Sequence, residues 1–197
     1  MPAEAGTEQI AERPATARVF FALWPPVALA EQLAETARAA AGQFGGRPTR
    51  QETIHLTLAF LGEVDASRLP EIVRVARHIE GPDFDLQIDH LAFWAHKRLL
   101  WAGCSAVPPA LRQLVEALQR NLAQAGYPPD SGGHGFTPHL SLLRRVPVAS
   151  AQPAVSPLAA LTMPAWSCRR FVLVRSQGSS LGSDYRIIDE FPLACRD

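Results

Sequence analysis

Cysteine, net charge and long apolar runs are all scarce in this sequence of 197 residues. The three cysteines, Cys104, Cys168 and Cys195, are odd in number and have no C-x-x-C spacing, which excludes a disulfide framework and a cysteine zinc site. The polar residues 1–17 are followed by the apolar run VFFALW, which is too short for a signal peptide or a membrane span. We therefore expect a cytoplasmic protein without membrane contact, with residues 1–17 as a disordered tail.

Charge is balanced over the whole chain but not along it. The 19 basic and 19 acidic residues give no bulk attraction for a long nucleic-acid duplex. Between Ser131 and Ser183 there is no acidic residue, although this segment contains Arg144, Arg145, Arg169, Arg170 and Arg175. A guanidinium fork fits phosphate oxygens, so this segment favours a small anionic ligand. Lys97 is the only lysine, however, so each arginine can also be read as an ordinary solvated basic residue.

Strand-like and helix-like segments alternate after the tail. Strands are expected over residues 18–24, 53–62, 85–94, 98–104, 137–145, 169–176 and 185–191, and helices over 27–43, about 67–80 and 111–125. The roughly twenty residues before 169 are expected to be a loop. This order predicts an α+β fold with a single domain over residues 18–197. Two similar lobes of mainly antiparallel sheet, with helices on the outside, would face one another across a central groove.

Two of these strands carry the same polar pattern. The first, TIHLTLAFLG at residues 53–62, has His55 and Thr57 on one face and apolar residues on the other. The second, FTPHLSLLRR at residues 136–145, repeats this pattern with His139 and Ser141. The shared sequence T-x-H-L-[TS]-L indicates two equivalent strands. In a bilobal fold, the polar faces of both strands can line the groove.

Two facing histidines can divide an acid–base reaction between them. A neutral imidazole accepts a proton from the nucleophile, and an imidazolium donates one to the leaving oxygen. The neighbouring hydroxyl groups can hold the oxygens of one phosphate, so the pattern favours phosphoryl chemistry over acyl transfer. The simpler interpretation is that both histidines are structural residues of a sheet, but the repetition argues against it. No H-E-x-x-H or similar cluster is present, and we expect neither a metal nor another cofactor.

The two motifs, the opening RVFFALWPP and the closing FVLVRSQGSSLGSDYRIIDEFPL resemble the two-histidine (2H) phosphoesterase superfamily. Within it, the likeness is to the RNA 2′,3′-cyclic phosphodiesterases, once named 2′-5′ RNA ligases, and it runs from about Arg18 to Leu193. The resemblance implies a bilobal fold and metal-independent hydrolysis of the 2′,3′-cyclic phosphate end of an RNA or oligonucleotide. The product would be a 2′-phosphomonoester, and a weak reverse 2′-5′ ligation would accompany hydrolysis.

The resemblance also assigns roles to the residues of the two HxTx motifs. His55 and His139 would be the catalytic pair, with His55 protonating the departing 3′ oxygen and His139 activating water. Thr57 and Ser141 would bind the phosphate. Serine replaces the commoner threonine at position 141, a change that preserves hydrogen bonding.

Further substrate contacts are less well defined by the motifs. Arg144 matches the arginine that usually closes the second motif, whereas strict alternation along the strand places Arg145 on the histidine face, so both are candidates. Thr49 and Arg50 stand where the family often has a tryptophan, which leaves the contacts to base or ribose open.

The aromatic residues and the remaining histidines have less specific patterns. Tyr185 and Phe44 are the candidates for stacking on a nucleobase. Large aromatic residues are more often core, and we expect this of Trp24, Trp94, Trp101 and Trp166. The four histidines without a following hydroxyl are interpreted as structural or surface residues: His78, His90, His96 and His134.

Two other functions remain open. The first is hydrolysis of a smaller substrate, such as a cyclic nucleotide or an ADP-ribose cyclic phosphate, because the motifs bind phosphate rather than base. The second is a non-catalytic nucleotide-binding module of the same fold, which retention of both histidines and both hydroxyls disfavours. The expected partner is an RNA or oligonucleotide with a 2′,3′-cyclic phosphate end, and the protein is expected to act as a monomer.

Overall fold

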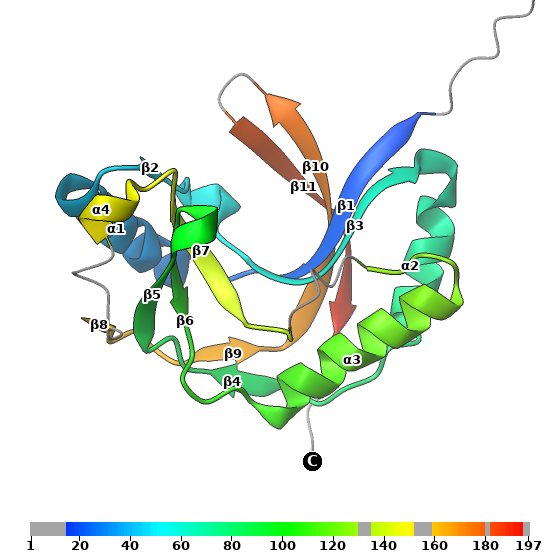
Figure 1. The fold of residues 1–197 in the computed structure, drawn as a ribbon. Helices are drawn as coiled ribbons and strands as arrows, with labels where there is room; N and C mark the ends of the chain where they lie inside the picture. Colours follow the sequence, from blue (N-terminus) through cyan, green and yellow to red (C-terminus); the bar gives the residue numbers. More distant parts are fainter. Residues whose placement is uncertain (1–14, 130–134, 152–158, 180–181, 195–197) are drawn as a thin grey trace, which may run out of the picture.

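The computed structural model describes residues 15–129, 135–151, 159–179 and 182–194 (Figure 1). Within them, nine strands form one strongly curved sheet, in the order β11-β10-β1-β3-β7-β6-β5-β8 with β2 paired to β7. One half consists of β1 (Thr16–Leu23), β3 (Leu56–Asp65), β10 (Arg170–Ser179) and β11 (Gly182–Pro192). The other half consists of β2 (Arg47–Pro48), β5 (His90–Trp94), β6 (Leu99–Gly103), β7 (His139–Arg144) and β8 (Ala159–Ala160).

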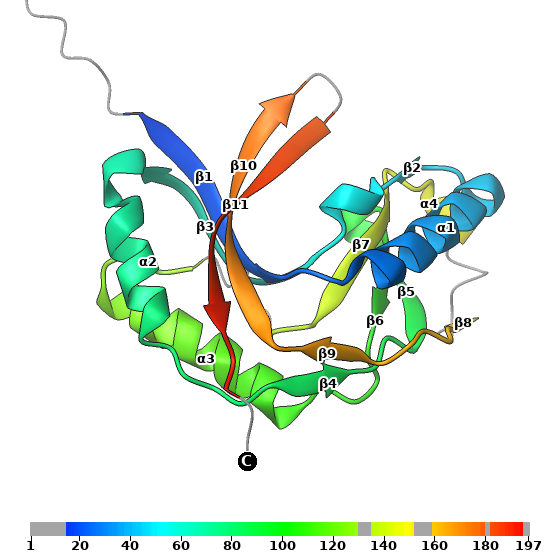
Figure 2. The ribbon, with the colours of Figure 1, turned by 180° about the vertical axis from the view of Figure 1, so that it is seen from behind.

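The two halves of the sheet meet at a narrow joint between β3 and β7. These strands are antiparallel, and their register contains the single pair Leu56 and Leu140, both fully buried. From this joint the strands diverge, so the halves form two lobes on either side of a concave surface (Figures 1 and 2). All strand pairs within the sheet are antiparallel. The predicted bilobal α+β fold is confirmed.

The helices cover the convex side, and two of them cross from one lobe to the other. Helix α1 (Val27–Phe44) follows β1 in sequence but packs against β7 of the other lobe. Helix α3 (Pro109–Gln124) follows β6 but packs against β3 and against α2 (Leu69–Arg77). Figure 2 shows this arrangement from behind, with α1 beside β7 and the pair α2 and α3 beside the opposite lobe. Each lobe is therefore completed by a helix from elsewhere in the chain.

The main core lies between the sheet and these helices. Helix α1 buries Leu29, Leu33 and Ala37, which recur at helical spacing, and α3 buries Leu111, Leu114 and Leu118 at a similar spacing. Two smaller apolar clusters lie outside this core. One groups Phe20, Ala22, Val172 and Val174 with the partly buried Trp24, Phe60 and Tyr185. The other groups Ala92, Leu99, Trp101 and Trp94.

Three sequence predictions are corrected by the strand boundaries. Strand β1 begins at Thr16, whose hydroxyl donates to Glu63, so residues 16 and 17 belong to the sheet and not to the tail. The expected strand 85–94 is two strands, because β4 (Phe84–Leu86) pairs with β9 (Trp166–Cys168) instead of continuing into β5. The segment before residue 169, which was expected to be a loop, contains the short helix α4 (Val148–Ala151) and the strands β8 and β9.

Three short 3₁₀ helices complete the fold: η1 (Gln51–Thr53), η2 (Ala66–Arg68) and η3 (Ala95–Lys97). The Asp65 carboxylate accepts a hydrogen bond from the Ser67 amide at 2.9 Å and so caps the start of η2. Among the described helices, none combines the length and the apolar character that a bilayer crossing requires.

Candidate active site

His55 lies immediately before β3, at the joint between the lobes. Its Nδ1 is 2.8 Å from the carbonyl oxygen of Thr53, and since a carbonyl can only accept, Nδ1 carries the proton. The other ring nitrogen, Nε2, is 3.1 Å from the Thr57 hydroxyl, which donates to it when the ring is neutral. The histidine and threonine of the motif therefore contact one another directly on one face of the strand.

His139 is held in the same way at the start of β7. Its Nδ1 donates to the carbonyl of Thr137 at 2.9 Å, so its Nε2 is also the unprotonated nitrogen of a neutral ring. In both motifs, therefore, the threonine two residues before the histidine fixes the tautomer through its backbone. The fixed tautomer makes Nε2 the atom through which each ring can exchange a proton.

The strand register relates the two motifs across the joint. Because Leu56 pairs with Leu140 in antiparallel orientation, the same register places position 55 opposite 141 and position 57 opposite 139. Each histidine therefore stands across from the hydroxyl residue of the other motif. His55 and Ser141 line one cavity of the groove, and His139 and Thr57 line the next.

Aromatic rings surround both imidazoles. Trp24 stacks on His55 with a centroid distance of 5.4 Å and an interplanar angle of 7°, and Tyr185 meets the same ring edge-on at 5.2 Å. On the other side, Trp94 meets His139 edge-on at 4.6 Å. These contacts fix the ring planes and exclude water from their faces.

Both histidines are harder to protonate than a histidine in water. The pKa of His55 is lowered from 6.5 to about 4. Burial is the main cause, the hydrogen bond to Thr53 opposes it, and the positive charges of Arg144 and His139 add to the lowering. Burial likewise lowers the pKa of His139, with further lowering by Lys97 and Arg144. The rings are thus poised as neutral groups that an arriving anion would help to protonate.

The cavity beside His55 is strongly basic. It measures about 350 Å³, and its described lining contains five arginines and no acidic residue: Arg18, Arg47, Arg50, Arg144 and Arg145. The adjacent cavity beside His139 is lined by Phe60, Trp94, Lys97 and Phe136, among others, and measures about 700 Å³. One side of the groove is therefore suited to an anionic ligand, and the other side is more aromatic.

Arg144 and Arg145 both line the basic cavity, and a bulge explains why. The pairing of β6 with β7 shifts register between Leu100 and Trp101, so that alternation breaks after Ser141 and Arg144 returns to the histidine face. The Arg144 guanidinium lies 3.4 Å from the Ser141 hydroxyl. Arg145 follows in the left-handed region with φ of 59°, and its carbonyl accepts a hydrogen bond from Arg98 at 3.2 Å.

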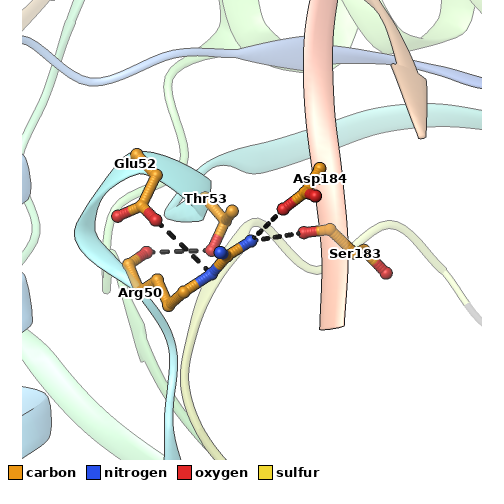
Figure 3. Close-up of polar contacts among 5 residues, drawn as sticks. All are labelled: Arg50, Glu52, Thr53, Ser183 and Asp184. Carbon is orange, nitrogen blue, oxygen red and sulfur yellow. Dashed lines mark hydrogen bonds and ion pairs between the residues drawn. The ribbon is translucent and has the colours of Figure 1, made fainter. Parts of the chain in front are cut away.

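Arg50 has a different role from its neighbours because it is engaged with the opposite wall. Its guanidinium donates to the Asp184 carboxylate at 2.6 Å and to the Ser183 carbonyl at 2.8 Å, and lies 3.4 Å from Glu52 (Figure 3). These contacts join the segment before the first motif to β11. The hydrogen bond to Asp184 raises the pKa of Arg50, so this charge is balanced by protein carboxylates.

A family model described as the 2′-5′ RNA ligase superfamily matches residues 25–180. The chain belongs to this superfamily. An RNA 2′,3′-cyclic phosphodiesterase of Escherichia coli is 35% identical over 127 residues, which cover 64% of this chain and 71% of that protein. A Thermus thermophilus protein of the same name is 29% identical and covers 89% of this chain and 90% of its own length. The resemblance found in the two motifs is therefore confirmed.

Solved structures of the superfamily have the same fold. E. coli LigT, crystallised in complex with 3′-AMP, superposes with a TM-score of 0.76 at 28% identity, covering 91% of this chain and 99% of LigT. The Thermus thermophilus protein TT0787 also gives 0.76, with 22% identity and coverage of 91% and 100%. At that lower identity, the second match supports the fold alone.

The structure corrects some of the expectations for the aromatic residues and leaves Tyr185 a candidate. Tyr185 lines the basic cavity beside His55, as a substrate-binding residue would. Phe44 was wrong as a stacking candidate, because it is the last residue of α1 and is buried in the main core. Trp24 and Trp94 were assigned to the core but lie half-buried against the two histidines. Trp101 and Trp166 are buried, as predicted.

Of the other described histidines, only His96 lies beside the two motif histidines, in the lining of the cavity next to His139. His78 is exposed at the end of α2, and His90 donates to Asp89 at 2.8 Å. His96 lines the aromatic cavity next to Trp94. His134 lies outside the described residues. Over the described part of the chain, no group of three potential ligand side chains is placed to hold a metal ion.

Proposed function

We propose that this chain hydrolyses the 2′,3′-cyclic phosphate ends of RNA or oligonucleotides to 2′-phosphomonoesters. The observation that carries the proposal is the pair of imidazoles whose tautomers are fixed by backbone carbonyls so that both Nε2 atoms are the reactive ones. The activity named for its E. coli relative, which is 35% identical, supports the same chemistry. A weak reverse 2′-5′ ligation would follow from the same machinery, because the same groups serve both directions.

In this proposal the two histidines act on opposite sides of the phosphorus atom. Nε2 of neutral His139 accepts a proton from water while the water oxygen forms its bond to phosphorus. The bond from phosphorus to the 3′ oxygen breaks, and protonated His55 donates its Nε2 proton to that oxygen. The 2′ oxygen keeps the phosphate, and proton exchange with solvent restores both rings.

The hydroxyl and guanidinium groups support this displacement. Thr57 and Ser141 would donate hydrogen bonds to the non-bridging oxygens, and the Arg144 guanidinium, 3.4 Å from the Ser141 hydroxyl, would balance the charge that develops there. Thr57 donates to His55 Nε2 while that ring is neutral, and its hydroxyl is released for the phosphate when the ring becomes protonated. Substrate binding and protonation of His55 are therefore coupled.

The test is hydrolysis of a dinucleotide with a 2′,3′-cyclic phosphate end in excess EDTA. In this mechanism two imidazoles perform the tasks that metal ions perform in two-metal phosphatases. The rate should therefore be unchanged by chelation. Phosphorus NMR should assign the product phosphate to the 2′ oxygen. Activity that is lost on chelation and restored by a divalent ion would contradict the mechanism, while a 3′-phosphate product would reverse the placement of the leaving group.

A substrate smaller than RNA is the second candidate function. The half-buried Tyr185 and the absence of acidic residues in the described lining of the basic cavity suit a nucleotide as well as an RNA end. Comparing turnover of a 2′,3′-cyclic mononucleotide with that of a short oligomer would rank the two. Binding of both without turnover would favour the non-catalytic alternative.

We further propose that the protein is a monomer and that it acts in the cytoplasm. One chain supplies both histidine motifs, which supports action as a monomer, and size-exclusion chromatography with light scattering would test this. Cys104 and Cys168 are buried free thiols, which is consistent with a reducing cytoplasm.

A further inference from the structure

The basic cavity holds more positive charge than a terminal cyclic phosphate requires. Of its five arginines, Arg50 is balanced by Asp184 and Glu52. Among the residues that the structure describes, Arg18, Arg144 and Arg145 have no acidic side chain within 4 Å that forms an ion pair. A cyclic phosphodiester carries a single negative charge, which the motif hydroxyls and Arg144 are placed to meet. Arg18 and Arg145 therefore remain as surplus charges.

Two further features indicate that these charges are arranged around a ligand. Arg47 of β2 stands directly opposite Arg144 of β7 in the strand register, and both residues line the basic cavity. Arg145 occupies the left-handed region, which costs free energy for a residue other than glycine and which Arg98 stabilises by bonding to its carbonyl. Strain of this kind is concentrated at ligand sites.

The position of the cavity relative to the reaction identifies which part of the substrate it receives. If His55 protonates the departing 3′ oxygen, the ribose lies on the His55 side of the phosphorus atom and water lies on the His139 side. The basic cavity is lined by His55, and its volume of about 350 Å³ is within the range of small-ligand sites. The group that continues from this ribose towards the rest of an RNA strand is the phosphate on its 5′ oxygen.

We propose that Arg18, Arg47 and Arg145 form a subsite for the 5′-phosphate of the terminal nucleotide, so that the preferred substrate carries two phosphates on one ribose. This inference rests on the proposed function and specifies its substrate. When RNA is cleaved at an internal position, the new terminal nucleotide always carries this phosphate. A free nucleoside 2′,3′-cyclic phosphate lacks it. The subsite would thus select RNA ends over small cyclic nucleotides without reading any base.

The test compares one nucleoside 2′,3′-cyclic phosphate with a 5′-hydroxyl and the same compound with a 5′-phosphate. With wild-type protein at low salt, the 5′-phosphate should raise kcat/KM about tenfold to a hundredfold, as expected for hydrogen bonds between charged groups. The variants Arg18→Gln and Arg145→Gln should each reduce this ratio several-fold, and the triple variant that also carries Arg47→Gln should bring it close to one. Arg38→Gln is the matched control, because Arg38 is exposed on α1 and does not line the cavity.

Salt dependence gives a second readout that a general loss of activity would not mimic. Because salt screens attraction between exposed charges, kcat/KM should fall more steeply with salt for the 5′-phosphorylated substrate than for the 5′-hydroxyl one, and the subsite variants should remove this difference. Equal kcat/KM values for the two substrates would overturn the subsite while leaving the hydrolase function intact. A ratio that survives in the triple variant, or that falls equally in Arg38→Gln, would also overturn it. Failure to hydrolyse either substrate would instead refute the proposed function.

Discussion

Binding of a phosphate should raise the pKa of His55 by more than two units. In the free protein, burial holds this pKa at about 4, so only about one ring in a thousand is protonated at pH 7. A single negative charge about 5 Å from Nε2, at an effective dielectric constant of about 20, contributes roughly 3 kcal/mol, or about 2.4 pKa units. The bound state should therefore bring His55 to about 6.5, where it can serve as a general acid near neutral pH.

Two measurements check this shift. Ring NMR of His55 should give a low pKa in the free protein and the higher value when the protein is saturated with a nucleotide 2′-phosphate. The resonances of His78, which is exposed at the end of α2, should not respond to the ligand. Kinetically, the bell-shaped profile of kcat/KM should lie at acidic pH, because it reports the free protein, and the profile of kcat should lie closer to neutral.

Two results would refute the reasoning. A free-state pKa of His55 near 6.5 would mean that the ring is not desolvated as the stacked Trp24 and the surrounding residues imply. A shift of less than half a unit on saturation would mean that the bound phosphate does not approach Nε2. The second result would leave His139 as the candidate for the general acid and would reverse the two roles.

Three sets of substitutions probe the rest of the site. His55→Ala and His139→Ala should each lower turnover about 100-fold or more with the circular dichroism spectrum unchanged. The loss of turnover in the double variant should be smaller than the product of the losses in the two single variants. Near-normal turnover of either single variant would remove that residue from the mechanism. Thr57→Ala and Ser141→Ala should each cost about tenfold to a thousandfold in kcat/KM, since each removes one donor to the phosphate, and a change below twofold would contradict this role. Asp184→Asn should raise KM several-fold with little change in the free energy of unfolding, because an exposed ion pair stabilises little. Urea unfolding and steady-state kinetics would separate these effects, and an unchanged KM would mean that the contact between Arg50 and Asp184 does not shape the cavity.

The arrangement of the candidate catalytic residues was predictable from sequence because their placement is local. His55 and Thr57 lie two residues apart on one strand, and alternation alone places both side chains on the same face. The same holds for His139 and Ser141. The backbone bonds that fix the tautomers also span only two residues, so the repeated threonine in each motif already carried that information.

The residues that were missed depend on pairing between distant segments. Trp24 and Trp94 reach the histidines only because β1 pairs with β3 and β5 lies in the same lobe as β7, which no local pattern reveals. Arg144 was a candidate through the resemblance alone, because it reaches the cavity by a register shift against β6 that alternation along its own strand does not contain. Phe44, in contrast, could have been excluded, since it lies seven residues after the buried Ala37 on the same face of α1.

The crossing of α1 to the opposite lobe has a consequence for synthesis on the ribosome. The apolar face of this helix is complete at Phe44, but β7, which covers it, begins at His139, 95 residues later (139 − 44). At translation rates of about 5 to 20 residues per second, that face remains without its partner for roughly 5 to 19 seconds. The nascent chain thus carries an exposed helix stripe for about half of its synthesis, a surface that chaperones bind and that favours aggregation when translation stalls between the two motifs.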